Sequence, residues 1–493
     1  MNGFDCKKYL KLQREKIQER IENSGDRLYL EFGGKLLDDH NASRVLPGFE
    51  YDAKVKLLQT FKEDTEIILC ICTKEIEKSK IRADYGITYS KEILRLIDEF
   101  RKLDLNVSGV VVTQYKNQAS TDIFCENLES FGIKTYKHLF IEGYPTDVEK
   151  ILSDKGYGAN EYIKTTKPLV VVTAPGPGSG KLATCMSQLY HEHKLGIKAQ
   201  YAKFETFPVW NLPLKHPVNI AYEATTADLE DVNMIDPFHL EKYGQIAVNY
   251  NRDIEIFPVV RNILEKITGK TIYYSPTDMG VNMVGFCIKD NDCVEEAAKQ
   301  EVIRRYYKAL CEHRKGFCSE KVEKRIELLM KDLNIKLEDR LVVAPALKKS
   351  EETASPAVAI KLKTGKIITG RTTSVMTGAA SVILNAVKQL SGITDNILLI
   401  SENVLNPIQD LKKNILNNSN ILLDINDVLT ALSICAITDS RANIALSKLK
   451  ELEGTQAHST YMLSDTEEKI YRSLKINITA EPMITENKLF KNN

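Results

Sequence analysis

LVVVTAPGPGSGKLAT occupies residues 169–184 and decides the fold class of this chain. An apolar, β-branched run predicts a buried strand, alternating Gly and Pro predict a loop, and Gly180-Lys181 opens a helix. Glycines tolerate positive φ and let backbone N–H groups approach an anion closely. The N-terminus of the helix adds unsatisfied donors and a partial positive charge, and Lys181 adds a full charge. This order of strand, loop and helix is typical of a phosphate-binding turn.

The loop matches the Walker A pattern, GxxxxGK[ST], only in part. Pro175 stands where the pattern has its first Gly, and Leu182 stands where it has the Ser or Thr that binds magnesium. The pattern therefore favours binding of phosphate or a nucleotide and disfavours Mg²⁺-dependent hydrolysis of the usual P-loop kind. A Gly/Pro turn with an exposed Lys is the plain structural alternative. The residues predicted to bind the anion, through N–H groups or the ammonium group, are Gly176, Gly178, Ser179, Gly180 and Lys181.

Length and charge set limits on the class of protein. A chain of 493 residues predicts two to four domains, and 43% apolar residues is ordinary for a globular protein. Lys plus Arg equal Asp plus Glu at 67 each, so the overall charge indicates neither a nucleic-acid nor a membrane partner. The charged N-terminus lacks the apolar core of a signal peptide, and no window approaches a membrane span, which predicts a cytoplasmic protein.

Cysteine usage also indicates a reducing compartment. The ten Cys occur without a CxxC pair, and several lie in apolar runs, such as IILCIC at residues 67–72. We therefore predict reduced core thiols. Cys311, His313 and Cys318 form one Cys/His group, but their spacing matches no common zinc pattern and no fourth ligand is evident, so no metal site is predicted.

From Arg27 to about Tyr201, apolar strand-like runs alternate with helix-periodic segments such as Ser90–Leu103. The runs are LYLEF, EIILCIC, SGVVVTQY, KTYKHLF and LVVVTA, and IKAQYAKF follows the helix that begins at Lys181. This alternation predicts an α/β fold with a mostly parallel, Rossmann-like sheet and a P-loop-like turn after one of its strands.

Three polar segments follow predicted strands: Gly33–Arg44, then Glu205 to His239, and Ser275–Asn282. Ligands of parallel sheets gather beyond the carboxyl ends of the strands, so we expect the three segments to share one cleft with the phosphate loop. Helix caps, turns and solvated charges are the plain alternative for any one of these residues. The candidate acid-base residues are His216, Glu223, Asp278 and His239.

The pattern divides the chain into three parts. Residues 1–290 form the predicted phosphate- or nucleotide-binding α/β domain. Residues 291–338 are predicted as a helical subdomain or oligomer contact, with two charged amphipathic helices broken at Lys315-Gly316. Residues 339–493 are predicted as a C-terminal α/β subdomain with a hairpin around Thr364-Gly365. Within this last part, Asn406-Pro407 is expected to start a helix.

Five stretches together point to a known family. They are EFGGKLLDDHNASRVLPGF, TAPGPGSGKLATC, ATTADLEDVNMIDPFHLEKYG, AVNYNRDIEIFPV and TGRTTSVMTGAAS. With this combination the chain resembles, over nearly its whole length, the bacterial family called domain of unknown function 1846, also named uncharacterised protein family 0371. The resemblance implies a multidomain α/β protein with a C-terminal α/β subdomain. It implies no substrate, reaction or catalytic residue.

Two functions fit these patterns. The first is an enzyme that acts on a phosphorylated small molecule or nucleotide, with Lys181 stabilising the phosphate and one of the four candidate residues transferring protons. The second is a regulator that responds to phosphate or a metabolite without chemistry and works as a homo-oligomer. A Ser/His/Asp hydrolase ranks third, because no GxSxG elbow occurs in the sequence.

Overall fold

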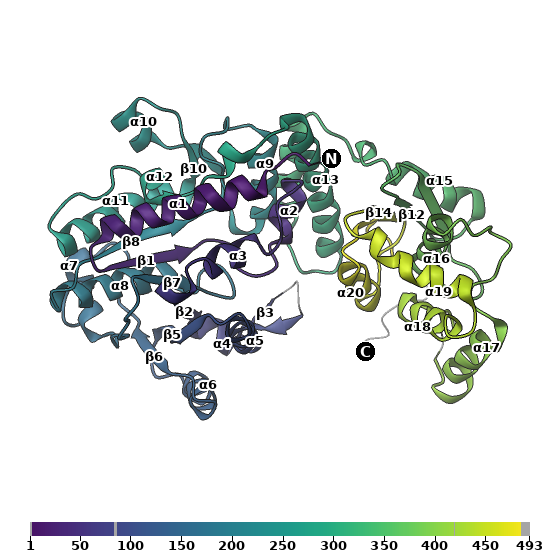
Figure 1. Ribbon diagram of the computed structural model, residues 1–493, viewed down its shortest axis with the longest axis horizontal. Coiled ribbons are helices and arrows are strands. Elements are labelled where there is room, and N and C mark those ends of the chain that lie inside the picture. Colours follow the sequence, from purple (N-terminus) through teal and green to yellow (C-terminus); the bar gives the residue numbers. More distant parts are fainter. Residues whose placement is uncertain (1, 83–85, 419, 485–493) are drawn as a thin grey trace. The chain divides into compact units, whose positions relative to one another are not determined.

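A computed structural model describes residues 2–82, 86–418 and 420–484 (Figure 1). The chain divides into two compact units, Met1–Ala298 and Lys299–Asn493. The boundary lies inside α13 (Asn291–Arg314), the first of the two helices predicted for residues 291–338. The first two turns of α13 therefore belong to the N-terminal unit, and the remainder of the predicted helical segment belongs to the C-terminal unit.

The N-terminal unit is built on a seven-stranded sheet in which every pairing is parallel. Its strand order is β11-β8-β1-β7-β2-β5-β6. The sheet confirms the predicted strands, because apolar β-branched runs are buried on both faces of a parallel sheet. The strands are β1 (Arg27–Phe32), β2 (Thr65–Cys72), β5 (Asn106–Tyr115), β6 (Thr135–Leu139), β7 (Leu169–Thr173), β8 (Ala199–Phe204) and β11 (Gly280–Val281).

Helices cover both faces of this sheet, as buried parallel strands require. One apolar core joins α1, α3, α5 and α6 to one face, and a second joins α7, α8 and α11 to the other. Two two-stranded ribbons, β3-β4 and β9-β10, lie outside the sheet. The remaining elements of this unit are α1 (Cys6–Ser24), α2 (His40–Val45), α3 (Ala53–Gln59), α4 (Thr73–Glu77), β3 (Ile81–Arg82), β4 (Ile87–Thr88), α5 (Tyr89–Lys102), α6 (Ala119–Ser130), α7 (Val148–Ile151), α8 (Lys181–Lys194), α9 (Pro217–Thr225), β9 (Asn233–Ile235), α10 (Pro237–Tyr243), β10 (Val248–Tyr250), α11 (Asn251–Thr268) and α12 (Pro276–Met279).

The order of the strands creates a switch point beside β7. After β2 the chain steps to β5 and β6, toward one edge of the sheet, whereas after β7 it steps to β8 and β11, toward the other. The crossovers follow opposite faces, since α5 belongs to one core and α8 to the other. Loops that leave adjacent parallel strands in opposite directions open a crevice at their carboxyl ends, where ligands of such sheets bind.

The C-terminal unit is a mixed α/β structure around a four-stranded sheet of order β13-β12-β14-β15. The antiparallel pairing of β12 with β13 confirms the hairpin predicted around Thr364-Gly365. Arg340 is buried here and donates hydrogen bonds to Thr479 Oγ1 and to the carbonyl of Asn477, at 3.1 and 2.5 Å. The elements are α14 (Glu320–Asp332), α15 (Val343–Thr353), β12 (Ala357–Lys361), β13 (Ile367–Arg371), α16 (Gly378–Leu390), α17 (Glu402–Asp410), α18 (Ile425–Cys435), α19 (Ser440–Ser447), β14 (Gln456–Ser459), α20 (Asp465–Ser473) and β15 (Asn477–Ala480).

The prediction that Asn406-Pro407 starts a helix is wrong. The helix α17 begins at Glu402, after Ser401, and Pro407 lies inside it. Proline lacks an N–H and normally weakens a helix interior, so its presence favoured a helix start. Here, Pro407 is only the sixth residue of α17, so it removes a single early hydrogen bond. A π-helical turn, Leu411–Ile415, follows α17 directly.

The structure also bears on the predictions made for the cysteines and for membrane-spanning segments. All ten cysteines are free thiols, and seven of them are buried. His313 pairs with Glu323 at 2.8 Å, whereas Cys311 and Cys318 contact backbone carbonyls. Across residues 2–82, 86–418 and 420–484, no group of three or more metal-ligating side chains could hold a metal ion. Over the same residues, no helix combines the length and apolar character needed to cross a bilayer.

A buried ion pair anchors the segment that follows β1. Lys54 on α3 and Asp39, which caps α2, approach to 2.8 Å, and both side chains are almost wholly buried. Burial alone raises the pKa of Asp39, but attraction to Lys54 outweighs it and leaves the pKa below its usual value. The ammonium group of Lys54 also lies 3.5 Å from where a Cβ on Gly34 would stand. The ion pair therefore packs against the Gly33-Gly34 turn.

We expect Lys54→Met to lower the free energy of unfolding by about 3–5 kcal/mol, because it leaves the Asp39 carboxylate buried without a partner. The double variant Asp39→Asn/Lys54→Met should recover most of this loss, since Asn keeps the acceptor for the N–H of Ala42 and carries no charge. Urea denaturation of both variants measures the difference. Equal destabilisation of the single and double variants would show that the ion pair is not what holds this segment.

Candidate functional site

The loop between β7 and α8 carries an uncapped helix N-terminus. Gly178 and Gly180 adopt positive φ of 79° and 85°, and no side chain caps α8 at Gly180. The first helical hydrogen bond runs from the N–H of Thr184 to the carbonyl of Gly180, at 2.9 Å. The N–H groups of Lys181, Leu182 and Ala183 therefore precede the helical ladder and have no partner within it. Such donors attract an anion.

The glycines of this loop extend the same set of donors. Within the described residues, the N–H groups of Gly178 and Gly180 donate to no protein acceptor. Lys181 is half-buried, and no carboxylate in the described part of the chain forms an ion pair with it. Together with the first turn of α8, these groups present several hydrogen-bond donors and one cation on a single short segment.

Side chains from β5 and α4 hold the loop in place. Ser179 is fully buried, and its hydroxyl donates to Glu75 Oε2 at 2.9 Å. Thr113 Oγ1 donates to the carbonyl of Ser179 at 3.0 Å. A Cβ on Gly180 would stand 2.7 Å from Thr113 Oγ1, and one on Gly176 would stand 2.2 Å from Tyr89 Oη. The hydroxyl of Ser179 thus serves the protein itself, which leaves only its N–H for a ligand.

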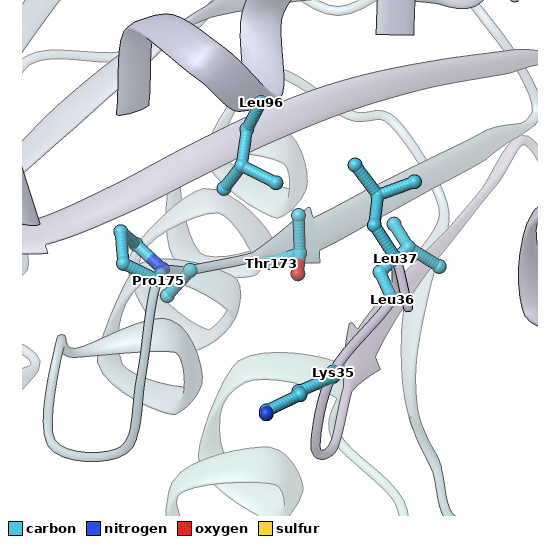
Figure 2. A pocket seen from close by; sticks show the side chains of 7 residues that line it. Lys35, Leu36, Leu37, Leu96, Thr173 and Pro175 are labelled. Atoms are coloured by element: carbon cyan, nitrogen blue, oxygen red, sulfur yellow. The ribbon is translucent and has the colours of Figure 1, made fainter. Parts of the chain in front are cut away.

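The turn after β1 faces this loop across a small pocket (Figure 2). The ammonium group of Lys35 points into the opening toward which the hydroxyl of Thr173 also points. The pocket has a volume of about 10 Å³, which leaves room for about one water molecule and is too small for a phosphorylated molecule. Its lining residues are Lys35, Leu36, Leu37, Leu96, Thr173, Ala174 and Pro175.

A second charged group lies on the α8 and α11 side of the same sheet edge. We call it the Lys203 cluster: Glu31, Lys203, Glu205 and Asp253. Lys203 Nζ lies 2.7 Å from Glu205 Oε1 and 2.5 Å from Asp253 Oδ2. Glu31 accepts a 2.8 Å hydrogen bond from Tyr201. Glu31 and Lys181 both act electrostatically on the thiols of Cys70 and Cys185, so the cluster adjoins the start of α8.

The electrostatics of the Lys203 cluster are unbalanced, with three carboxylates around one ammonium group. Burial raises the pKa of Glu205, as does repulsion from Asp253 and Glu31, and Lys203 opposes them; the result is about 7. Burial lowers the pKa of Lys203, but its three carboxylate neighbours reverse this and hold it above the usual value. A carboxyl group poised near neutrality at the mouth of a parallel sheet is suited to proton transfer.

The structure places His216 at the N-cap of α9 and Glu223 within that helix. His216 Nδ1 accepts from the N–H of Val218, and its Nε2 lies 3.0 Å from Asn291 Oδ1 at the start of α13. Glu223 Oε2 accepts from the N–H of Asn233, the first residue of β9, at 3.1 Å. These contacts fasten α9 to its neighbours.

His239 and Asp278, in contrast, come together. His239 Nδ1 lies 3.0 Å from Ser275 Oγ and 3.7 Å from Asp278 Oδ1. The hydroxyl of Tyr243 donates to Asp278 Oδ2 at 3.0 Å. Because Ser275 and Asp278 face the same ring nitrogen, His239 cannot relay a proton between them through its two nitrogens, as a hydrolase triad requires.

The three polar segments reach the carboxyl edge of the sheet through particular residues. Lys35 of the first segment lines the pocket with the loop after β7. The Tyr222 hydroxyl of the second would lie 3.9 Å from a Cβ on Gly34. Gly280 of the third would bring a Cβ within 2.9 Å of Glu205 Oε2.

Sequence reasoning missed Glu31, Lys203, Asp253, Glu75 and Thr113. For the first two a signal existed, because LYLEF and AQYAKF each carry one charged side chain near the end of an otherwise buried strand. Buried charges need partners and mark functional sites more often than chance. The other three depend on contacts between distant segments, which no local pattern records.

Comparisons with known proteins agree along the whole chain. Residues 2–334 match "Domain of unknown function DUF1846, N-terminal", and residues 338–490 match "Domain of unknown function DUF1846, C-terminal". A "UPF0371 protein" of Clostridium botulinum (strain ATCC 19397 / Type A) is 55% identical over 500 residues, which cover 100% of this chain and 99% of that protein. A "UPF0371 protein" of Clostridium tetani (strain Massachusetts / E88) has the same identity and coverage.

We expect Gly180→Ala to be more destabilising than Gly178→Ala. Both residues have positive φ, which costs a Cβ-bearing residue about 1–2 kcal/mol. A Cβ on Gly178 meets nothing within 4 Å, whereas a Cβ on Gly180 would press on buried Thr113 at 2.7 Å and add about 1–3 kcal/mol. Chemical denaturation of the two variants tests the difference, and equal stabilities would mean that the loop is not packed against β5.

Proposed function

We propose that this chain, which belongs to the family described as domain of unknown function DUF1846, binds the phosphate group of a small phosphorylated molecule or nucleotide at the P-loop-like turn between β7 and α8. The observation that carries this proposal is the uncapped N-terminus of α8, with free N–H groups at Gly178, Gly180 and the first turn. A buried or half-buried helix end without a cap calls for another partner. An anion supplies that partner.

The position and charge of the turn support the same proposal. It follows β7, beside the switch point of a Rossmann-like parallel sheet, where ligands of such folds collect. Lys181 on the turn and Lys35 across the pocket supply cations for a phosphate. Leu182 offers no oxygen ligand, so the phosphate would be held by N–H groups and lysines, without Mg²⁺ at this residue.

An enzyme is the leading form of this proposal. Phosphate binding at the turn would fix the molecule, and a titratable group at the same sheet edge would transfer a proton. His216, Glu223, Asp278 and His239 were the candidates from sequence. Among these four, His239 and Asp278 lie together. The Lys203 cluster adds Glu205 to the candidates.

A non-catalytic regulator that works as a homo-oligomer is the second candidate. Exposed apolar side chains gather between residues 229 and 246, a segment that contains β9, α10 and the approach to β10. Large exposed apolar patches are typical of interaction surfaces. We propose that a second copy of this chain covers them. The side chains are Leu229, Val232, Met234, Ile235, Leu240, Tyr243 and Ile246.

We also propose a cytoplasmic location with neither nucleic acid nor membrane as partner. Ten free thiols suit a reducing compartment, and Lys plus Arg balance Asp plus Glu at 67 each.

Lys181→Ala should weaken the binding of inorganic phosphate by roughly tenfold or more, because a charge-assisted hydrogen bond contributes about 1.5–3 kcal/mol. Isothermal titration calorimetry with phosphate measures the change. Lys194→Ala is the matched control, since Lys194 ends the same helix and pairs with exposed Asp154. Wild-type protein that binds no phosphate, or equal affinity in all three proteins, would contradict the proposed site.

For the regulator, Ile246→Glu should reduce the molar mass of the particle in solution to that of one chain, because it places a charge on the proposed contact. Light scattering after size exclusion measures the mass. Phe131→Glu is the control. Phe131 is as exposed as Ile246, at 64%, but lies outside the proposed contact at residues 229–246. A wild-type protein that is monomeric with and without phosphate would remove this candidate.

A further inference from the structure

The carboxyl ends of three adjacent strands place Glu205 across from the phosphate loop. β8, β1 and β7 are neighbours in the sheet, and Glu205 directly follows β8 as the loop directly follows β7. Adjacent strands lie about 4.8 Å apart, so Glu205 and the loop are separated by about 10 Å, with the Gly33-Gly34 turn between them. A small phosphorylated molecule spans that distance.

Glu205 is held so that one carboxylate oxygen remains for a ligand. Its Oε1 pairs with Lys203 at 2.7 Å, and Lys203 in turn pairs with Asp253 on α11. Its Oε2 accepts no hydrogen bond from a described residue and lies beside Gly280, where a Cβ would stand 2.9 Å from it. The carboxyl group is nine-tenths buried, so its orientation is fixed by these neighbours.

We propose that Glu205 is the residue that exchanges a proton with the phosphorylated molecule bound at the β7–α8 loop. This inference rests on the proposed function and deepens it. As a carboxylate, Glu205 accepts one proton from a hydroxyl or an acidic C–H of the bound molecule, and as a carboxylic acid it returns that proton. The substrate class is therefore a phosphate ester whose proton-bearing group lies roughly two strand spacings, about 10 Å, from the phosphate.

The charges around Glu205 make its proton exchange sensitive to an anion bound at the β7–α8 loop. Lys203 from β8 favours the carboxylate, while Asp253 from α11 and Glu31 from β1 favour the acid. A dianion at the loop adds a further negative charge about 10 Å away. At an effective dielectric constant of about 20, the two charges of the dianion raise the pKa of Glu205 by about two. Binding of a dianion at the loop should therefore cause Glu205 to take up a proton near pH 7.

Calorimetry with sulfate tests the inference, because sulfate resembles the phosphate dianion but does not itself titrate near neutrality. Titrations at pH 7 in several buffers of different ionisation enthalpy report the protons taken up per anion bound. We expect about half a proton for the wild type, because Glu205 with a pKa of about 7 is half ionised at this pH and the bound anion drives it toward the acid. Glu205→Gln should bind sulfate and take up essentially none.

Glu255→Gln is the matched control, because it removes one exposed carboxylate from the same helix that carries Asp253. It should retain the uptake of the wild type. Uptake in the wild type should also vanish below about pH 5.5, where Glu205 is already protonated. This pH profile is measured on the wild type, so it still tests the role of Glu205 if the Glu205→Gln variant does not fold.

Each outcome is informative. Absence of sulfate binding to the wild type would overturn the proposed phosphate site. Binding without proton uptake, or uptake that persists in Glu205→Gln, would leave that site intact and overturn the role of Glu205. Stability gives a further readout: a folded-state pKa above the unfolded value means that the folded protein loses stability as pH rises from about 4.5 through 7. Glu205→Gln should flatten this slope.

Discussion

The packing of Ser179 between Glu75 and Thr113 is the constraint on which the proposed site depends. Its hydroxyl and carbonyl are both used inside the protein, at 2.9 and 3.0 Å, and the side chain is fully buried. This fixes the backbone of a turn in which the N–H groups of Gly178 and Gly180 donate to no acceptor in the described part of the chain. A glycine at position 180 is required, since any side chain there would meet Thr113. A loop that was free to relax would satisfy its own donors.

Much of the fold could be predicted from the sequence, because its main signals are local. LVVVT and EIILCIC are apolar and β-branched, and they form buried parallel strands with helices between them. The helix after Lys181 was evident from its start and its apolar stripe. Pro407 misled the prediction because proline favours the first turn of a helix, whereas here it is the sixth of nine residues.

The site could be predicted only in part, because its geometry depends on contacts between distant residues. Glu75 and Thr113 lie 104 and 66 residues from Ser179 in the sequence. Lys203 and Asp253 are 50 residues apart, yet they form one ion pair with Glu205 beside them. The sequence favoured two histidines and two carboxylates in the polar segments as proton carriers, whereas the strand order favours Glu205, which follows β8 at the edge shared with β7.

The most direct test of the central claim is the amide NMR spectrum of the protein, labelled with ¹⁵N in glycine and lysine, during titration with inorganic phosphate. If phosphate binds at the uncapped start of α8, the amide signals of Gly178, Gly180 and Lys181 should shift most and saturate together, since hydrogen bonding to an anion moves amide protons strongly. Saturating shifts elsewhere, with these three signals unmoved, would contradict the account.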